Sequence, residues 1–186
     1  LNAAIARLKQ SGPIQLVTYG NDENPTAVAA KINTPANAVV GFAGNGVEIG
    51  QIASTIKAKA GNIQIIGNSS WQGTALLSAP SLQGALIATP DTSNEKIVAD
   101  KYRQKYGSLP SSVAFQVYDT VAIVAGINRA KGKTGLTDGT VTTQSGFKGA
   151  TGSFRFRADG SVDRLFALKS VKGGNLIQLS PAPTRF

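Results

Sequence analysis

Polar and aromatic side chains gather in three short segments, each directly after an apolar run that is typical of a buried strand. Their amide, hydroxyl, phenol and indole groups can orient a small polar molecule by hydrogen bonds without carrying out chemistry on it. The candidate ligand-binding residues are Tyr19, Asn21, Gly44, Asn45, Gly46, Asn68, Ser69 and Trp71. For Trp71 a structural role, packing beneath a chain crossover, is an equally good interpretation.

The residue types that most often carry out catalysis are missing. The chain has no cysteine and no histidine, which excludes disulfides, thiol nucleophiles, histidine bases and the usual zinc ligands within it. We therefore expect no enzymatic activity, no metal and no other cofactor. Asp119 is the most conspicuous carboxylate because it lies in an apolar stretch, and we interpret it as a structural hydrogen-bond or ion-pair partner.

Two glycine-rich segments come close to nucleotide-binding motifs without matching them. Gly44, Gly46 and Gly50 are spaced one residue too far apart for the dinucleotide fingerprint, and Gly67-Asn68 stands where an acidic residue would hold a ribose. The segment 126–134 has one residue too many between its glycines for a phosphate loop, and it follows a helix instead of a strand. Neither segment predicts a nucleotide site.

The elements that position the polar segments alternate between helices and strands. Apolar runs predict strands at 14–19, 38–42 and 63–66. Helical spacing predicts helices at 1–12, at 25–32 and from the glycine-rich loop 44–46 up to Gly61. Pro25 stands at a first helical position, and Asn45 with Glu48 has the form of a capping box. The alternation indicates an α/β fold, a parallel sheet flanked by helices whose polar loops lie at one edge.

The second half of the chain has a different pattern. Residues 85–88 resemble a strand, residues 93–106 and 112–130 resemble helices, and residues 131–144 are predicted to be polar and mobile. Phe154 and Phe156 alternate with arginines before the turn pair Asp159-Gly160, which predicts a β-hairpin returning at 165–171 and a last strand at 176–179.

The net charge of the chain and the distribution of its basic residues limit the classes of partner that it could bind. The net charge is +9, but the basic residues are scattered and aromatic residues are few, so we expect no nucleic acid. A basic cluster comes late in the chain, at Lys148, Arg155, Arg157 and Arg164. It is either an ordinary solvated surface or a docking face for an acidic partner. No apolar run approaches the roughly 20 residues of a membrane helix.

The order of motifs resembles the second half of type 1 periplasmic solute-binding proteins, the branched-chain amino acid receptor family. Residues 78–130 contain the series Tyr102-x-x-x-Tyr106-Gly107, then a proline, then Tyr118-Asp119. Residues 146–179 resemble that family's closing hairpin, with Phe147, Gly149, Gly152, Phe154, Phe156 and Gly160 at the matching positions. The ending SPAPTRF is similar to penicillin-binding-protein activators related to the lipoprotein LpoA.

The resemblance implies a periplasmic protein of two lobes that binds a small polar solute or amino acid between them, for uptake with an ABC permease or for sensing. Residues 1–84 would be second-lobe α/β units, 85–145 a return segment of the first lobe, and 146–186 a closing β-hairpin segment. Family members use a carboxylate for the ligand ammonium where this chain has Asn68-Ser69-Ser70.

The alternative implied by the resemblance is an envelope lipoprotein that binds and activates a penicillin-binding protein or peptidoglycan synthase. Both interpretations imply a location in the periplasm or cell envelope, with a lipid anchor in the full-length protein. A helix beginning at Leu1 without a preceding strand suggests that most of the first lobe is absent, and another chain or copy would then supply it.

Overall fold

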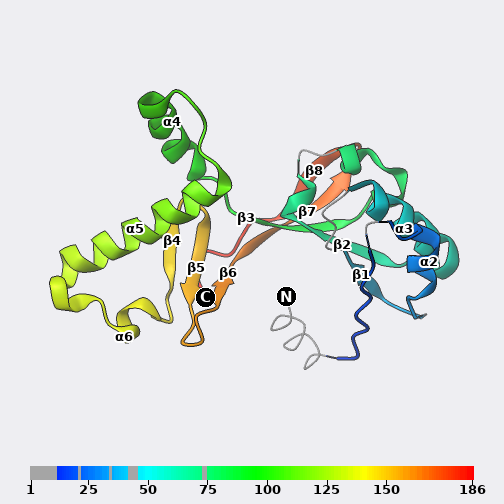
Figure 1. Ribbon diagram of the computed structural model, residues 1–186, viewed down its shortest axis with the longest axis horizontal. Coiled ribbons are helices and arrows are strands. Elements are labelled where there is room, and N and C mark those ends of the chain that lie inside the picture. Colours follow the sequence, from blue (N-terminus) through cyan, green and yellow to red (C-terminus); the bar gives the residue numbers. More distant parts are fainter. Residues whose placement is uncertain (1–11, 21, 34, 42–45, 73–74) are drawn as a thin grey trace. The chain divides into compact units, whose positions relative to one another are not determined.

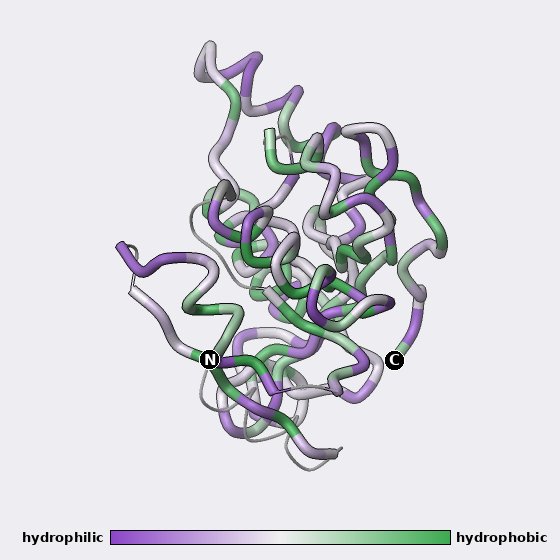
Figure 2. The backbone as a smooth tube through the Cα atoms, turned by 90° about the vertical axis from the view of Figure 1, so that its right-hand side faces the viewer, coloured by the Kyte–Doolittle hydropathy of each residue, from purple (hydrophilic) through white to green (hydrophobic). Residues whose placement is uncertain are grey.

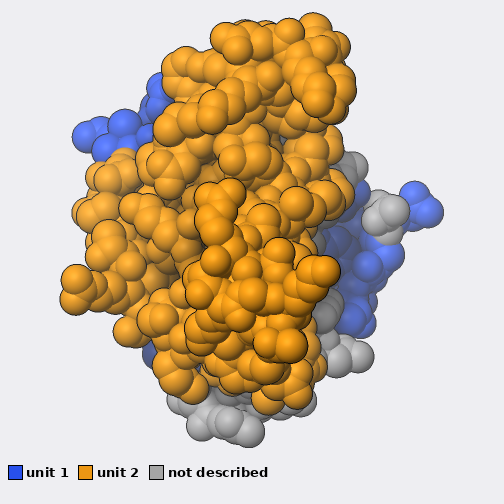
Figure 3. Space-filling view, turned by 90° about the vertical axis from the view of Figure 1, so that its left-hand side faces the viewer, with its two compact units in different colours: residues 1–87, 170–177 blue, residues 88–169, 178–186 orange. Residues whose placement is uncertain are grey.

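The structure, a computed structural model, describes residues 12–20, 22–33, 35–41, 46–72 and 75–186. It has a mixed α/β fold, in which a sheet of mostly parallel strands is flanked by helices, and this confirms the predicted fold class (Figure 1). The chain divides into two compact units: unit 1 is residues 1–87 and 170–177, and unit 2 is residues 88–169 and 178–186 (Figure 3).

Unit 1 is built around two parallel strands and two helices. Strand β1 (Ala38–Val40) pairs in parallel with β2 (Gln64–Asn68), with Ala38 opposite Gln64 and Val40 opposite Ile66. Helix α2 (Pro25–Ala30) begins at its proline, and the Asn24 side chain caps it by accepting from the N–H of Thr26 at 2.8 Å. Helix α3 (Gly46–Ala60) packs against α2.

The core of unit 1 forms as the apolar spacing predicts. Ile49, Ile52, Ala53 and Ile56 recur at helical spacing on α3, and all four are buried. They join a hydrophobic cluster with residues of α2, β2 and the segment between β2 and the next strand. The other members are Val28, Ala29, Ile63, Ile65, Trp71, Leu76, Leu77, Leu82, Ala85, Ile87 and Val171.

The strand predicted at 14–19 is wrong, because these residues have no regular secondary structure. The Gln15 side chain ties the segment to the chain after α2, donating to the carbonyl of Lys31 at 2.6 Å and accepting from the N–H of Asn33 at 2.7 Å. Ile14 and Leu16 are exposed, so these apolar residues do not mark a buried strand. The helix predicted at 1–12 and the Asn45 cap lie almost entirely outside the described residues.

The larger sheet has five strands in the order β1-β2-β3-β7-β8. Short 3-10 turns, η1 (Ser69–Trp71), η2 (Ala75–Ser78) and η3 (Pro80–Leu82), lead to β3 (Leu86–Pro90). Strands β7 (Phe166–Lys172) and β8 (Asn175–Ser180) complete the sheet. The chain passes between units 1 and 2 within β3, β7 and β8.

Unit 2 contains two helices and a small antiparallel sheet. Helix α4 (Glu95–Tyr106) ends at Gly107, whose φ of 74° is left-handed, and helix α5 (Ser112–Lys131) is capped by the Ser111 hydroxyl. Strands β4 (Phe147–Gly149), β5 (Gly152–Phe156) and β6 (Val162–Arg164) pair antiparallel. The turn between β5 and β6 holds Asp159-Gly160, as predicted. The strand that returns from this turn is β6 and not the predicted 165–171, because most of that segment is β7 of the larger sheet.

The segment predicted to be irregular, 131–144, contains two short helical turns. They are η4 (Lys133–Gly135) and α6 (Asp138–Val141), and α6 starts with a capping box between Thr137 and Thr140. Threonine hydroxyls that cap backbone N–H groups give this polar sequence regular turns without an apolar face.

Candidate functional site

Gly41, directly after β1, and Trp71, after β2, meet at the carboxyl ends of these two parallel strands. Gly41 extends the pairing beyond β1, because its N–H donates to the carbonyl of Ile66 at 2.8 Å. A side chain has no room at this position: a Cβ on Gly41 would lie 2.9 Å from Cδ1 of Ile49 and 3.3 Å from Cζ2 of Trp71. The two strand ends and the first turn of α3 are therefore packed closely together.

Trp71 lies beneath this edge and not at its rim. The residue is 1% exposed and belongs to the hydrophobic cluster. A Cβ on Gly67 would lie 2.5–2.6 Å from three atoms of the indole, so the ring lies directly on the Gly67 backbone. In this conformation the indole offers no surface to a ligand. Its structural interpretation therefore fits the structure, and the ring's part at the site is to hold the segment after β2 in place.

Asn68 and Ser69 form a tight turn at the end of β2. The Asn68 side-chain oxygen accepts from the N–H of Ser70 at 2.9 Å and from its hydroxyl at 2.5 Å, which caps η1. Ser69 and Ser70 are exposed. The turn thus presents hydroxyl groups to solvent, while the Asn68 oxygen is used by the fold itself. It carries no carboxylate with which to bind an ammonium group.

Tyr19 is half-buried against the hydrophobic cluster of unit 1. Burial, and then the nearby carboxylate of Glu48 in the first turn of α3, raise the pKa of the Tyr19 hydroxyl above its ordinary value. A phenol in this environment stays protonated at neutral pH and can donate a hydrogen bond. Tyr19 is thus close enough to α3 for its hydroxyl to be affected by charge at the start of that helix.

The remaining candidate residues belong to loops that the structure does not describe. Asn21, Gly44 and Asn45 lie outside the described residues, and Gly46 is the first residue of α3. The structure brings the backbone of Gly41 and Gly67 together around Trp71. The convergence of Tyr19, Asn45 and Trp71 on one crevice stays a prediction, because Asn45 lies outside the described residues.

Asp119 has a structural role in unit 2, as interpreted from the sequence. It is 2% exposed on α5 and accepts three hydrogen bonds: from the N–H of Ala150 at 2.7 Å, the N–H of Thr151 at 3.0 Å and the Thr151 hydroxyl at 2.6 Å. A Cβ on Gly149 would lie 2.4 Å from the carboxyl carbon. The carboxylate therefore binds the turn between β4 and β5 to α5, and glycine is required for the approach.

Charged groups around Asp119 extend this arrangement. Arg164 donates to the Thr151 hydroxyl at 2.9 Å and to its carbonyl at 3.2 Å, and its guanidinium lies 4.8 Å from the centre of the Phe154 ring. Burial lowers the pKa of Arg164, and the Asp119 charge opposes this effect. Burial, and then the same charge, raise the pKa of Glu95. These shifts have the causes expected of a buried structural network, and they need no catalytic explanation.

The basic cluster predicted from the sequence is partly neutralised. Asp163 accepts from Nε of Arg155 at 3.0 Å and from Nε of Arg157 at 2.8 Å. The guanidinium of Arg155 also lies 4.5 Å from the centre of the Phe186 ring. Two of the four basic residues are thus bound to a neighbouring carboxylate, which favours an ordinary surface over a dense cationic face.

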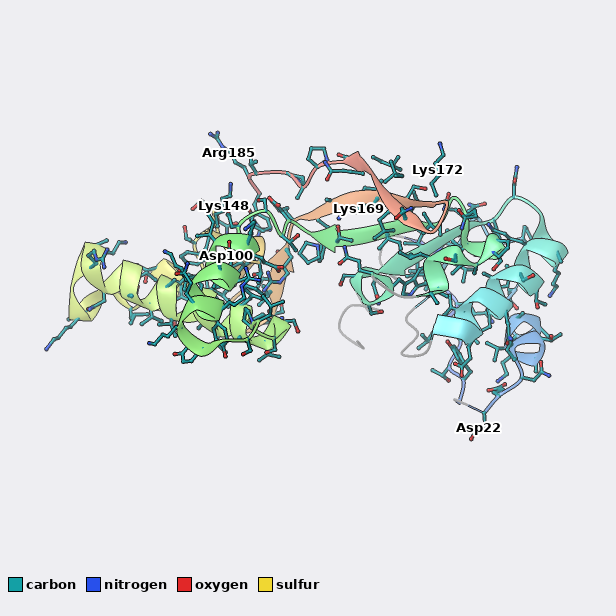
Figure 4. The ribbon with its side chains drawn as sticks, turned by 90° about the horizontal axis from the view of Figure 1, so that it is seen from above. Asp22, Asp100, Lys148, Lys169, Lys172 and Arg185 are labelled. Atoms are coloured by element: carbon teal, nitrogen blue, oxygen red, sulfur yellow. The ribbon has the colours of Figure 1, made fainter. Side chains whose placement is uncertain are left out.

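A polar pocket in unit 2 was not found from the sequence. It has a volume of about 400 Å³, and its lining residues are Pro90, Asp91, Thr92, Ser93, Ala167, Lys169, Gln178, Pro181 and Ala182. The N–H and hydroxyl of Ser93, and then Lys148, lower the pKa of Asp91. Lys169 lies on β7 and Lys148 on β4 (Figure 4). The lining comes from three separate segments, 90–93, 167–169 and 178–182, so no local motif could have indicated it.

The described residues hold neither a metal-binding cluster nor a membrane-spanning helix. Within that part of the chain, no group of three or more acidic, histidine or cysteine side chains could hold a metal ion. Across the described ranges, no helix has the length and apolarity to cross a membrane, and hydrophobic segments alternate with hydrophilic ones (Figure 2).

Comparison with solved structures decides the fold. The leucine-binding protein LivK from Thermotoga maritima matches 96% of this chain and 55% of its own, with a TM-score of 0.58 at 16% identity. The branched-chain amino acid transporter substrate-binding protein LivJ from Streptococcus pneumoniae, solved with isoleucine, matches 97% of this chain and 56% of its own, with a TM-score of 0.54 at 22% identity. The chain has the type 1 periplasmic-binding-protein fold.

The same fold includes a regulatory protein. The C-domain of LpoA from Haemophilus influenzae, a regulator of PBP1A, matches 96% of this chain and 56% of its own, with a TM-score of 0.57 at 14% identity. This chain spans little more than half the length of each of these proteins. No known family profile and no curated protein sequence matches it. The structural neighbours named here are thus binding or regulatory proteins.

Proposed function

We propose that this chain forms part of a periplasmic receptor that binds a small polar ligand without chemical conversion. The observation that carries the proposal is the meeting of the segments after β1 and β2 at one edge of a parallel sheet, around Gly41 and Gly67. Proteins with open α/β sheets bind their ligands at such an edge. Solute-binding proteins with the same fold support the assignment.

Within this proposal the Tyr19 phenol and the Ser69 hydroxyl are the hydrogen-bonding groups. Asn68 shapes the turn, and Trp71 supports it from below. Asn21 and the loop 44–46 remain proposed contacts. The ligand would lie against unit 1 and be closed over by a second lobe, as in a two-lobed receptor. The partner of such a receptor is an ABC permease or a sensor, and lipid anchoring of the full-length protein is part of the same proposal.

Affinity should be weak when this chain binds alone. A small-molecule site normally encloses about 70–90% of its ligand, and contacts from one lobe leave roughly half of the ligand in water. Losing three or four hydrogen bonds of about 1 kcal/mol each weakens binding by about two to three decades. Isothermal titration calorimetry with the standard L-amino acids tests this. Millimolar binding that weakens in Tyr19→Phe and Ser69→Ala, but not in the exposed α3 variant Ser54→Ala, is expected.

A variant in the pocket of unit 2 tests, in the same experiment, whether the ligand binds in that pocket instead. If Lys169→Ala weakens binding and Tyr19→Phe does not, the ligand site lies in the pocket and the proposed site is wrong. Micromolar binding by a monomer of the 186-residue chain would contradict the need for a second lobe.

A second candidate function is a regulator of cell-wall synthesis that has kept the fold without amino-acid binding. The observation that favours it is the turn 68–71, where the Asn68 oxygen is used by Ser70, no carboxylate is present, and the indole is buried. The regulator LpoA shares the fold. Biolayer interferometry with a purified peptidoglycan synthase separates the two functions, because binding to the synthase with no heat from any amino acid supports the regulator.

A further inference from the structure

The pocket of unit 2 is formed by that unit alone. All of its lining residues belong to unit 2, whereas the candidate site around Gly41 and Gly67 belongs to unit 1. Its volume of about 400 Å³ lies within the range of roughly 300–1,000 Å³ that is usual for small-molecule sites. The function proposed above makes no use of this pocket, so its lining has to be explained separately.

One wall of the pocket is the turn that leads from β3 to α4, and its shape is fixed by local contacts. The Asp91 side chain accepts a hydrogen bond from the N–H of Ser93 at 3.0 Å. The Asp91 backbone lies against Gly152 of β5, where a Cβ would be 3.1 Å from the Asp91 carbonyl oxygen. Pro90 restricts the backbone where the turn begins. A wall held in this way needs little ordering when a ligand binds.

Lys169 brings a positive charge to the pocket. It lies on the same side of β7 as Ala167 and Val171, which are buried, and it is itself half-buried. Its ammonium makes no hydrogen bond or ion pair with any residue that the structure describes. A partly buried charge that no neighbouring group compensates favours an anionic ligand, which supplies both the opposite charge and hydrogen-bond acceptors.

Asp91 brings a negative charge to the same pocket, and it forms no ion pair with Lys169. Hydrogen bonds from Ser93, and then the charge of Lys148, lower the pKa of the Asp91 carboxyl, so this group is ionised at neutral pH. The charges of Lys148 and Lys169 together exceed that of Asp91. This positive excess favours a ligand with a net negative charge over a neutral zwitterion such as an amino acid.

The uncharged polar groups of the pocket are suited to hydroxyl groups on a ligand. Thr92 and Gln178 are exposed, and their side chains have no hydrogen-bond partner among the described residues. The Asp91 carboxylate accepts hydrogen bonds and donates none. Pro90 and Pro181 add apolar surface against which a carbon skeleton can pack. The pocket thus combines one site for an anion with several groups that can bind hydroxyls.

We propose that the pocket of unit 2 is a second ligand site, which binds a small carboxylate that carries several hydroxyl groups, such as a sugar acid. Lys169 binds the carboxylate, and Asp91 and Gln178 bind hydroxyls. A phosphate group fits poorly, because the Asp91 carboxylate repels a second negative charge in the same pocket. The proposal does not depend on ligand binding by unit 1.

The test is isothermal titration calorimetry of the 186-residue chain with a matched series of six-carbon compounds. D-Gluconate has the carboxylate and the hydroxyls, D-gluconamide lacks the charge, hexanoate lacks the hydroxyls, and D-glucosaminate adds an ammonium. We expect gluconate to bind at least about tenfold more tightly than each of the others, because each lacks a hydrogen-bonding or charge contact that gluconate makes.

Lys169→Met removes the ammonium and keeps a long aliphatic side chain, and it should weaken gluconate binding at least about tenfold. Lys169→Arg keeps the charge and should retain binding. The matched control is Lys172→Met, because Lys172 is an exposed lysine of the same strand that does not line the pocket (Figure 4). This variant should bind gluconate as the wild type does.

Recognition of the hydroxyls is tested separately with Gln178→Leu, which should weaken gluconate binding and leave hexanoate binding unchanged. Tyr19→Phe should not affect gluconate, which separates this site from that of unit 1. The proposal is overturned if gluconate does not bind at concentrations up to about 10 mM, or if its binding survives in Lys169→Met. Hexanoate binding as tight as that of gluconate would mean a site for simple anions, and tighter binding of glucosaminate would mean a site for zwitterions. Either result would also contradict the proposal.

Discussion

Units 1 and 2 are stabilised in different ways. The hydrophobic cluster lies entirely in unit 1, where it includes Trp71 and residues of α2, α3 and β2. In unit 2 the buried residues are divided between apolar side chains, Phe115, Ala150, Phe154 and Ala167, and polar ones, Thr89, Asp119, Thr151 and Ser153. Most of the large exposed apolar residues of the described chain also belong to unit 2. Unit 1 buries most of its apolar surface, whereas unit 2 leaves many large apolar side chains exposed.

This difference makes the buried carboxylate of Asp119 important for holding unit 2 together. With little apolar burial, α5 and the turn between β4 and β5 are joined by three hydrogen bonds to Asp119. Such a network is directional, and it loses most of its value when one member is removed. Packing in unit 1 is instead shared among the many members of the hydrophobic cluster. Fluorescence of Trp71, the one tryptophan of the sequence, reports on unit 1 alone.

The largest effect is expected for Asp119→Ala. The variant leaves two N–H groups and one hydroxyl buried without their acceptor, which costs about 3–5 kcal/mol of unfolding free energy. The helical signal of circular dichroism should therefore melt earlier, while the Trp71 fluorescence transition moves less. Thr120→Ala, at an exposed position of the same helix, is the control and should change little. A loss below about 1 kcal/mol would show that the network is not what holds unit 2 together.

The next largest effect is expected at a buried aliphatic residue of α3, and it is compared with the effect at an exposed aliphatic residue of α5. Ile56 of α3 is buried, and Ile56→Ala should cost about 2–5 kcal/mol through lost burial and a cavity. Val121 of α5 is exposed, and Val121→Ala should change stability by less than about 0.5 kcal/mol. Urea unfolding followed by Trp71 fluorescence and by circular dichroism measures both. A cost at Val121 as large as that at Ile56 would mean that Val121 is covered by other residues of this chain.

The sequence predicted the fold of both units well, because periodicity and turn residues are local signals. The positions of α2, α3, α4 and α5, and the Asp159-Gly160 turn, followed from spacing, caps and glycines. The strand at 14–19 failed for a nonlocal reason: an apolar run becomes a strand only if a neighbouring strand pairs with it. Here the Gln15 side chain makes the connection instead.

The candidate site was harder to predict than the fold. The order of elements indicated that the segments after β1 and β2 share one edge, but no sequence signal distinguished an exposed tryptophan from a buried one. The decisive feature is the absence of a side chain at Gly67, which lets the indole lie on the backbone. The pocket of unit 2 combines three segments distant in sequence, so only a three-dimensional structure could reveal it.

A smaller effect is expected where the indole of Trp71 lies on Gly67. Gly67→Ala places a methyl group where ring atoms now lie, and the shift of the ring should cost about 1–3 kcal/mol. Gly126→Ala is the matched control, because that glycine lies within α5 with open space around it, and it should gain about 0.5–1 kcal/mol. In a Trp71→Leu background the cost of Gly67→Ala should shrink, and additive costs would contradict the proposed contact.

The smallest effect concerns Asp163, and its pH dependence separates charge from packing in unit 2. The hydrogen bond from Arg157, and then that from Arg155, lower the pKa of Asp163 below its unfolded value of about 4. A carboxylate whose folded pKa is lowered stabilises the fold above the unfolded pKa, and the contribution is lost as the pH falls through the folded pKa. Asp163→Asn should therefore cost about 0.5–1 kcal/mol at pH 7. The thermal midpoints of variant and wild type should converge between pH 4 and about pH 2.

In an Arg155→Gln/Arg157→Gln background the same substitution should have no pH-dependent effect, because the pairing that lowers the pKa is gone. A difference that stays constant from pH 7 to pH 2 would assign the role of Asp163 to the geometry of the β5–β6 hairpin and not to its charge.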